Sequence, residues 1–321
     1  MTPKKHLKLK KKVMYVGLFS LTLIIFLINL GLHFYQNYKY KQTYEYKLIT
    51  IGYTKEEATL LLKSFNEEEE LKKILDQKKN EKLIQVIQEK YYMKKNLDRY
   101  LAYIEKNKDT SINEVVTLVN VHRDSDYYEN TIEANLDKGI LLNVNKYYYL
   151  SEEYIPEELE KISIRYAYAG NNMINEANTA FYDLCKSAEQ DGLTLIVNSS
   201  YRSYENQVNT YRSIKNAKGE READKTAARP GHSEHQTGLS VDVFEKNNQS
   251  TLTFKDSEAY SWLKENAHNY GFIERYPEGK ENITGYNPEA WHWRYVGTEV
   301  AKIIHDENIT FDEYYAFYVE N

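Results

Sequence analysis

Hydrophobic and charged positions separate most sharply in the first fifty residues. The first dozen residues contain six lysines: Lys4, Lys5, Lys8, Lys10, Lys11 and Lys12. Residues 13–34 then hold no charged side chain apart from His33, and a run of that length matches the hydrocarbon core of a bilayer. Only three lysines follow by residue 50, and lysine-rich flanks face the cytoplasm. We therefore predict a cytoplasmic basic tail at residues 1–12 and a single-pass transmembrane signal anchor at residues 13–34.

A cleaved signal peptide is the competing interpretation of this run. The apolar region of a signal peptide is about 7–15 residues long and is followed by a small-x-small cleavage site. Here the run is longer and ends in the sequence LGLHF, which contains no such site. We expect an uncleaved anchor, with the chain from about residue 35 onward outside the cell.

Residues 35–110 place apolar positions at helical spacing. Thr54 and Glu57 have the types and the spacing of a capping box. Apolar stripes follow at about 58–65, 71–75 and 97–104. A coiled-coil stalk would require an unbroken heptad pattern, which these stripes do not keep. We predict a helical linker or spacer made of short packed helices.

Residues 111–321 change pattern and predict an α+β domain. Residues 115–119 and 141–145 have the composition expected of strands. Residues 172–190 carry an amphipathic helical stripe, and residues 193–197 follow as a short apolar strand. These elements predict a small antiparallel sheet with flanking helices.

The composition narrows the functional classes. The chain has 321 residues, of which 41% are hydrophobic and 28% charged, so it is long enough to bury a core and too balanced for a disordered tail. A net charge of −6 argues against a nucleic-acid partner, which would need a basic face. The single cysteine, Cys185, excludes an intramolecular disulfide and a cysteine-rich zinc site, and we expect it to be a small buried residue.

Two clusters of polar, glycine and aromatic residues suggest a metal site. A strand after Gly238 would project Asp242, and the glycine would let the chain turn so that His235 meets this carboxylate. His292, on a later strand, would supply a third ligand. Three nitrogen or oxygen ligands with a fourth position open to water are typical of catalytic zinc. Glu289, three residues before the last ligand, can then act as general base.

Each of these residues has a more ordinary explanation when it is taken singly. A buried histidine is more often part of a core, and an aspartate more often belongs to a turn or an ion pair. These separate structural roles do not explain why two histidines, an aspartate and a glutamate occur together in these two clusters. The set as a whole therefore favours a hydrolytic metal site.

Three ordered motifs resemble those of the VanY-type D-alanyl-D-alanine carboxypeptidases. SEHQTGLSVD at residues 233–242 resembles the S-x-H-x-x-G-x-x-x-D zinc motif, and EAWHWRYVG at residues 289–297 resembles the E-x-W-H motif. SSYRSY at residues 199–204, followed by Gln207, resembles the S-x-Y-R-S…Q element. The resemblance covers about residues 115–310, and three motifs in this order are highly specific.

The resemblance implies a role for each motif residue. It places one zinc ion per catalytic domain on His235, Asp242 and His292, and it makes Glu289 the catalytic base. Ser240 stands where alanine is common in the family, a substitution that is conservative in volume. This serine is also a candidate for substrate binding.

Arg202 and its neighbours are the candidates for substrate recognition. The guanidinium could pair with the terminal carboxylate of a peptide or with the scissile carbonyl, and the sequence does not choose between the two. Gln207 and Ser233 are candidates for hydrogen bonds to the substrate.

The two tryptophans beside the histidine of the second motif alternate along a strand, so we expect one of them in the core and one beside the cleft.

The function implied by these residues is that of a zinc-dependent D-alanyl-D-alanine carboxypeptidase. Its partners would be a peptidoglycan stem peptide, from which it releases the terminal D-alanine, and the bacterial cell membrane, with the catalytic domain extracellular. One alternative is an L,D-carboxypeptidase that acts on stem tetrapeptides. Another is a catalytically silent wall-binding module, which would have no need to keep a base beside a metal.

Overall fold

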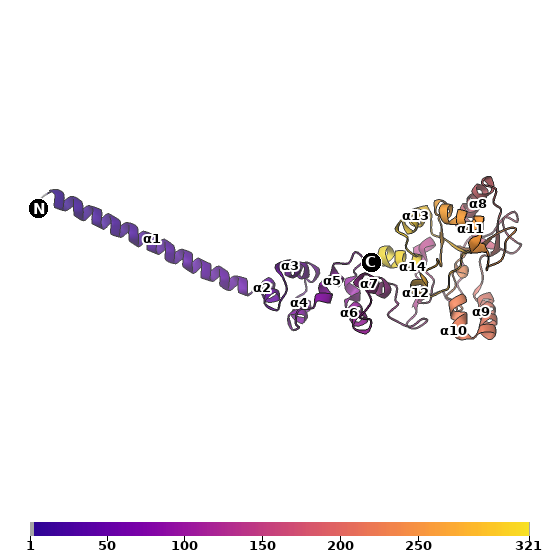
Figure 1. Cartoon of the computed structure of the whole chain (residues 1–321), viewed down its shortest axis with the longest axis horizontal. Helices are drawn as coiled ribbons and strands as arrows, with labels where there is room; N and C mark the ends of the chain where they lie inside the picture. Colours follow the sequence, from indigo (N-terminus) through magenta and orange to yellow (C-terminus); the bar gives the residue numbers. More distant parts are fainter. Residues whose placement is uncertain (1–2, 321) are drawn as a thin grey trace. The chain divides into compact units, whose positions relative to one another are not determined.

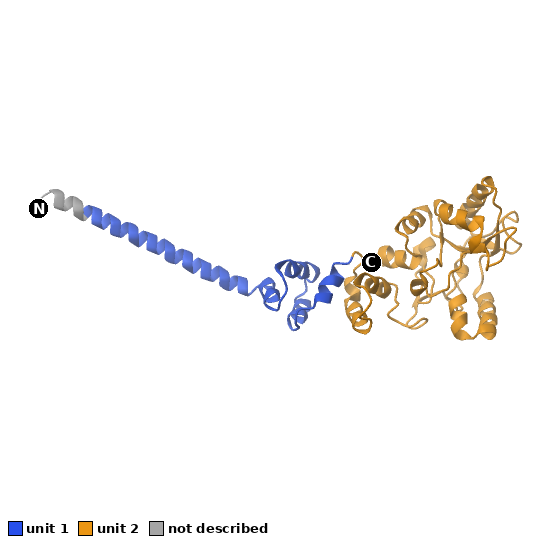
Figure 2. Cartoon of the chain, in the orientation of Figure 1, with its two compact units in different colours: residues 1–89 blue, residues 90–321 orange. Residues whose placement is uncertain are grey.

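The computed structural model describes residues 3–320, with side chains from residue 10 onward, and divides the chain into two compact units (Figures 1 and 2). The first unit covers Met1–Glu89 and the second covers Lys90–Asn321. The side chains of Lys4, Lys5 and Lys8 lie outside the described residues. The second unit thus begins before residue 111, where the sequence places the start of the catalytic domain.

The first unit consists of one long helix followed by four short ones. Their bounds are α1 (Pro3–Lys41), α2 (Tyr44–Thr50), α3 (Lys55–Ser64), α4 (Glu68–Leu75) and α5 (Glu81–Ile87). Within α1, the stretch Lys10–Lys41 is long and apolar enough to cross a membrane, and its apolar side chains are exposed. The structure of α1 is therefore consistent with a membrane-spanning segment.

The capping box at the start of α3 is present as predicted. The backbone N–H of Glu57 donates to Thr54 Oγ1 at 3.1 Å, and the backbone N–H of Thr54 donates to Glu57 Oε2 at 2.8 Å. Such a reciprocal pair satisfies two of the unpaired donors of a helix start. Leu48, Leu61 and Leu71 are buried, so α2, α3 and α4 form a small core of packed helices. The short packed helices predicted for this region are confirmed.

The second unit combines short strands and helices. Its strands are β1 (Ile132–Glu133), β2 (Tyr148–Tyr149), β3 (Leu159–Lys161), β4 (Asn172–Ile174), β5 (Leu195–Ser199), β6 (Ser240–Glu245), β7 (Phe272–Glu274) and β8 (His292–Tyr295). Its α-helices are α6 (Leu97–Lys106), α7 (Ile112–Asn120), α8 (Asn175–Gln190), α9 (Tyr204–Lys218), α10 (Glu220–Thr226), α11 (Glu258–Asn266), α12 (Glu281–Thr284), α13 (Thr298–Glu307) and α14 (Phe311–Tyr314). Short helical turns complete the unit: η1 (Lys94–Asn96), η2 (Leu136–Leu141), η3 (Glu234–Thr237), η4 (Phe254–Asp256), η5 (Ala267–Tyr270) and η6 (Tyr315–Val319).

A four-stranded antiparallel sheet, in the order β5-β6-β8-β7, lies at the centre of this unit. Val241 and Val243 point from β6 into a core that includes Phe181 of α8 and Leu263 of α11. Asp242, between the two valines, points to the opposite face because strand side chains alternate. The predicted α+β class, with helices flanking a small antiparallel sheet, is confirmed.

Two predicted strands of this unit are wrong. Residues 115–119 belong to α7, whose N-cap Ser111 accepts a hydrogen bond from Glu114 N at 3.3 Å. Val115 and Val119, one helical turn apart, are both buried, so tertiary packing on a helical face overrides the preference of valine for strands.

Residues 141–145 do not form a strand either. They run from the end of η2 into an irregular segment that precedes β2. Asn145 Oδ1 accepts hydrogen bonds from the backbone N–H groups of Tyr147 and Tyr148 at 2.8 and 3.0 Å. A side chain that bonds the backbone locally in this way offers an alternative to a sheet ladder.

Helix α8 and strand β5 agree with the sequence, apart from small shifts in their bounds. The apolar stripe predicted over 172–190 forms α8, and its first three residues form β4. Cys185 lies on α8 and is fully buried, and burial raises the pKa of its thiol well above the usual range. The cysteine is therefore a small core residue, as expected.

Candidate active site

The register of the central sheet brings two candidate ligands together. Asp242 of β6 and His292 of β8 are directly paired across adjacent antiparallel strands. His235 comes from η3, which ends at Gly238 in a left-handed conformation with φ of 69°. A side chain here would strain this left-handed backbone, and its Cβ would lie in tight contact, 3.0 Å, with Leu159 Cδ2, so the turn favours glycine. The turn predicted between the first two ligands is confirmed.

The three side chains present one ligand atom each to a common point. His235 Nε2 lies 3.3 Å from Asp242 Oδ2, and His292 Nδ1 lies 3.0 Å from Asp242 Oδ1. All three ligand atoms lie within 4.8 Å of one another. Tetrahedral zinc with bonds of about 2.0–2.1 Å sets its ligands about 3.3 Å apart, so these residues fit the ion. Burial would raise the pKa of Asp242, but the two imidazoles hold it well below its usual range.

The remaining nitrogen of each imidazole has a partner that fixes the ring. His235 Nδ1 lies 2.7 Å from the carbonyl oxygen of Ser200, and His292 Nε2 lies 3.3 Å from Glu234 Oε2. Both partners can accept the ring proton, so with a metal on the opposite nitrogens each imidazole would be held as the tautomer that leaves its lone pair to the metal. Partners of this kind orient metal-binding histidines in general.

Glu289 enters the same cavity, of about 190 Å³, as the three ligands. Its backbone is held at the start of β8, because its N–H donates to the Tyr276 carbonyl at 3.0 Å and its own carbonyl accepts from His292 N at 3.0 Å. Burial raises the pKa of its carboxyl group to about 7. A carboxylate with this pKa can exchange a proton near neutral pH.

Arg202 lines this cavity and is held at both ends of its guanidinium. Its Nη1 donates to Gln207 Oε1 at 2.8 Å, and its Nη2 donates to Ser199 Oγ at 2.7 Å. Gln207 also donates from Nε2 to the Ala228 carbonyl at 2.7 Å. Both polar ends of this glutamine are therefore used within the protein, which favours a role in holding the arginine over a direct bond to substrate.

The other two candidates for substrate binding differ in position. Ser233 lines the cavity beside the metal ligands. Ser240, the first residue of β6, lies two residues before Asp242 on the same strand face, and it is fully buried and does not line the cavity. The expected substrate contact of Ser240 therefore has no support in the structure, because its side chain faces the protein interior.

The two tryptophans of the second motif separate as expected. Trp293 pairs with Val241 across the sheet and is buried in the core. Trp291 precedes β8 and lines the cavity.

Several residues of the cavity and of the buried layer around it were not predicted from the sequence. Tyr276 and Tyr286 line the cavity. Glu234 is 1% exposed and contacts a metal ligand; burial would raise the pKa of its carboxyl, but Arg275 and Arg294 hold it well below its usual range. A charged residue between two motif positions was the available signal for this glutamate.

Two histidines and an aspartate around one point, with a glutamate in the same cavity, define a mononuclear metallohydrolase site. The sequence model of the VanY family, D-alanyl-D-alanine carboxypeptidase, matches residues 170–298. The chain belongs to this family, and it is a zinc carboxypeptidase whose ligand set agrees with the zinc expected from the sequence.

Curated relatives and a solved structure support the family assignment. The Bacillus subtilis (strain 168) protein YodJ is 40% identical over 190 residues, which are 56% of this chain and 67% of YodJ. A D-alanyl-D-alanine carboxypeptidase of Enterococcus faecalis is 36% identical over 200 residues, 58% of this chain and 71% of the relative. The structure of the LdcB LD-carboxypeptidase is 35% identical, covers 59% of this chain and 91% of its own, and has a TM-score of 0.54.

Proposed function

We propose that this protein is a membrane-anchored carboxypeptidase that removes the terminal D-alanine from peptidoglycan stem peptides. The observation that carries the proposal is the meeting of three metal ligands, Glu289 and Arg202 in one cavity. The D-alanyl-D-alanine carboxypeptidase named among the relatives supports the choice of the D,D bond.

The residues of the cavity suggest how hydrolysis proceeds. Zinc, when bound to His235, Asp242 and His292, supplies a Lewis acid that acidifies water. Glu289 takes the proton of the attacking water as the oxygen adds to the scissile carbonyl. Arg202 stabilises the negative charge that develops on the carbonyl oxygen. Glu289 then gives the proton to the leaving nitrogen as the C–N bond breaks, which releases D-alanine and regenerates the carboxylate.

The proposal is tested by mass spectrometry of synthetic stem peptides. The full chain in detergent is incubated with a stem pentapeptide and a stem tetrapeptide, once with zinc and once with a chelator. We expect the pentapeptide to lose one alanine in zinc only, since chelation removes the Lewis acid.

Other outcomes of the same experiment would overturn this proposal in defined ways. Loss of alanine from the tetrapeptide alone would assign the L,D bond, which the name of the LdcB neighbour makes the second candidate. No cleavage of either peptide by a zinc-loaded protein would favour the silent wall-binding module.

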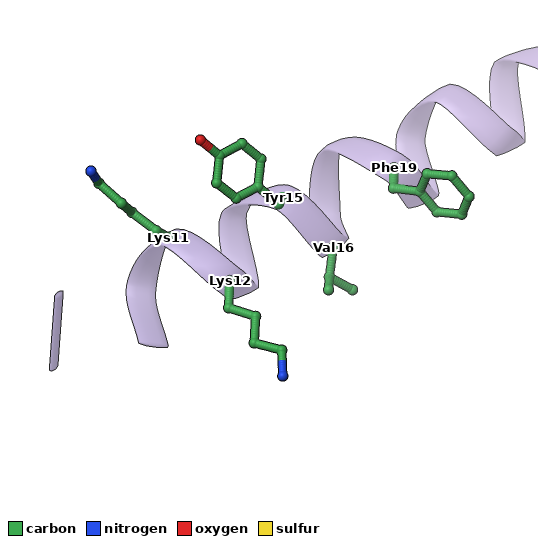
Figure 3. A pocket seen from close by; sticks show the side chains of 5 residues that line it. All are labelled: Lys11, Lys12, Tyr15, Val16 and Phe19. Atoms are coloured by element: carbon green, nitrogen blue, oxygen red, sulfur yellow. The ribbon is translucent and has the colours of Figure 1, made fainter. Parts of the chain in front are cut away.

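The anchor is proposed to place the catalytic unit outside the cell. Lys11 and Lys12 project from the start of the apolar stretch of α1, with Tyr15 one turn further along (Figure 3). Lysine at the cytoplasmic end and tyrosine at the interface are typical of a membrane helix. We expect a protease added to intact protoplasts to digest residues 90–321. Digestion only after lysis would contradict this orientation.

A further inference from the structure

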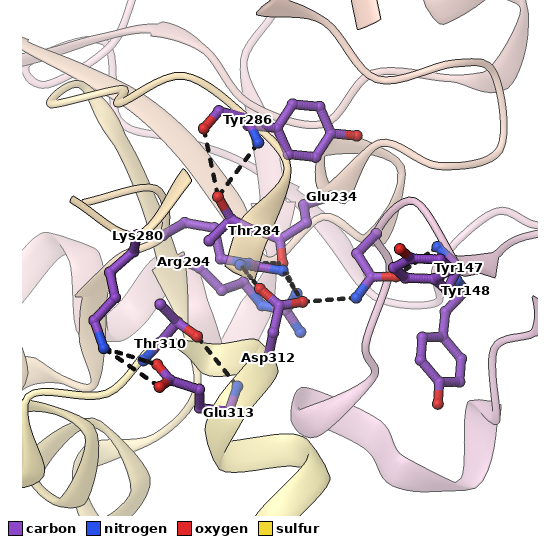
Figure 4. A network of polar contacts seen from close by, with 12 residues as sticks. Tyr147, Tyr148, Glu234, Lys280, Thr284, Tyr286, Arg294, Thr310, Asp312 and Glu313 are labelled. Atoms are coloured by element: carbon purple, nitrogen blue, oxygen red, sulfur yellow. Dashed lines mark hydrogen bonds and ion pairs between the residues drawn. The ribbon is translucent and has the colours of Figure 1, made fainter. Parts of the chain in front are cut away.

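A group of buried charges contacts the candidate ligand His292 through Glu234, which Figure 4 shows together with Arg294 and Asp312. It contains two carboxylates, Glu234 and Asp312, and two guanidinium groups, Arg275 and Arg294. None of the four side chains is more than 4% exposed. The opposite charges balance in number, and each carboxylate is bonded to at least one guanidinium. Such a group is costly to disturb, because removing one member leaves a buried charge without its partner.

The C-terminal segment supplies one of these carboxylates through α14. Asp312 pairs with Arg275 through both oxygens, at 2.5 Å to Nη1 and 3.1 Å to Nη2. A capping box between Thr310 and Glu313 fixes the start of α14, and Glu313 also pairs with Lys280 at 3.1 Å (Figure 4). The start of α14 is therefore fixed by the capping box and the ion pair, and the aspartate that it carries is fixed by Arg275.

Arg275 connects this helix to the carboxylate that contacts the metal ligand. Its Nε donates to Glu234 Oε1 at 2.7 Å, and Arg294 Nη1 donates to the same oxygen at 2.9 Å. The second oxygen, Oε2, is thereby left for His292 Nε2 at 3.3 Å. The two oxygens of one glutamate thus face two arginines on one side and the imidazole on the other.

The two arginines differ in what holds them. Arg294 Nη2 also donates to the carbonyl oxygens of Ile140 and Leu142, at 3.0 and 2.7 Å, so it has anchors of its own. Among the described residues, Arg275 pairs its guanidinium with Glu234 and Asp312. The orientation of its fork therefore depends on the aspartate of α14.

We propose that Asp312 and Arg275 are positioning residues of the metal site, which aim Glu234 at His292 and so keep His292 Nδ1 turned toward the metal. On this basis α14, which carries Asp312, contributes to zinc binding by orienting the residues that contact His292. The inference rests on the zinc site of the proposed carboxypeptidase. It concerns zinc affinity, so it can be tested even if the choice of peptide bond is wrong.

The test is a double-mutant cycle of Glu234→Gln and Asp312→Asn in the full chain, measured by competition for zinc with a chelator. We expect Glu234→Gln to weaken zinc binding by about 10- to 100-fold, the range typical of residues that orient metal ligands. We expect Asp312→Asn to weaken it by about 10-fold alone and to add almost nothing in the Glu234→Gln background. Asp306→Asn, which removes an exposed carboxylate from α13, is the matched control and should bind zinc normally.

Thermal unfolding of the zinc-free variants separates positioning from a structural role. A structural role would lower the unfolding temperature of Asp312→Asn but leave the zinc dissociation constant of the folded protein unchanged, and that result overturns the proposal. An equal weakening in both backgrounds overturns it as well, because the aspartate would then not act through Glu234. Should Asp312→Asn fail to fold, Arg275→Lys, which keeps the charge but loses the fork, is expected to weaken zinc binding similarly.

The outcome of the peptide-cleavage experiment does not determine the outcome of this double-mutant cycle. If the protein cleaves neither stem peptide, the zinc dissociation constants still report whether α14 acts on the ligand. If it cleaves the pentapeptide but the four dissociation constants are additive, the function stands and the inference about α14 is wrong.

Discussion

The Glu289→Gln variant is expected to keep its zinc and to lose about 10²- to 10⁴-fold in kcat, the usual contribution of a general base. Glutamine has nearly the same shape but cannot accept the proton of water. Zinc is retained because the ligand atoms come from His235, Asp242 and His292, and Glu289 is not among them. The measurement is the zinc content of the purified variant together with its rate of alanine release.

Glu278→Gln is the control for this prediction, since it makes the same change on an exposed glutamate nearby in the sequence. Its rate should equal that of the unchanged protein. Loss of zinc from Glu289→Gln would show that the residue is a ligand, and an unchanged rate would show that the proton goes elsewhere. Either result would contradict the role proposed for Glu289.

The meeting of the candidate ligands His235 and Asp242 was predictable because their spacing encodes the local geometry that joins them. Gly238 gives the turn between His235 and Asp242, and strand alternation sends Asp242 away from the valines on either side. His292 is fifty residues further along the chain, and only strand pairing brings it opposite Asp242. The second cluster of polar and aromatic residues indicated this third ligand, and the register of β6 and β8 explains physically how it reaches Asp242.

The wrong strands and the missed residues share a physical reason. Residues 115–119 have strand-like composition, but they form part of α7, because packing of Val115 and Val119 in the core outweighs the local preference for a strand. The role of Glu234 depends on Arg275 and Asp312, which are far away in sequence and meet it only in the folded chain. The local sequence pattern contains no information on contacts between residues so far apart, so the burial of Glu234 and its partners could be found only in the structure.

Loss of Arg202 is expected to affect the reaction at the carbonyl rather than recognition of the free carboxylate, a choice that the sequence left open. The backbone N–H of Arg202 donates to the carbonyl of the metal ligand His235 at 3.0 Å, so the residue is tied to the reacting centre. Gln207 and Ser199 hold its guanidinium in place before substrate arrives. Donors fixed in advance stabilise developing charge better than mobile ones, because little reorganisation is needed.

We therefore expect Arg202→Ala to reduce kcat/KM by about 10²- to 10³-fold, the range found when one stabilising donor is removed. The reduction should be equal for a pentapeptide with a free C-terminus and for its C-terminal amide, each compared with the unchanged protein. Arg212→Ala, which removes an exposed arginine from α9, should leave both rates unchanged. A loss confined to the free-acid peptide would instead assign Arg202 to the terminal carboxylate, because only that peptide offers the guanidinium a negative partner before the reaction begins.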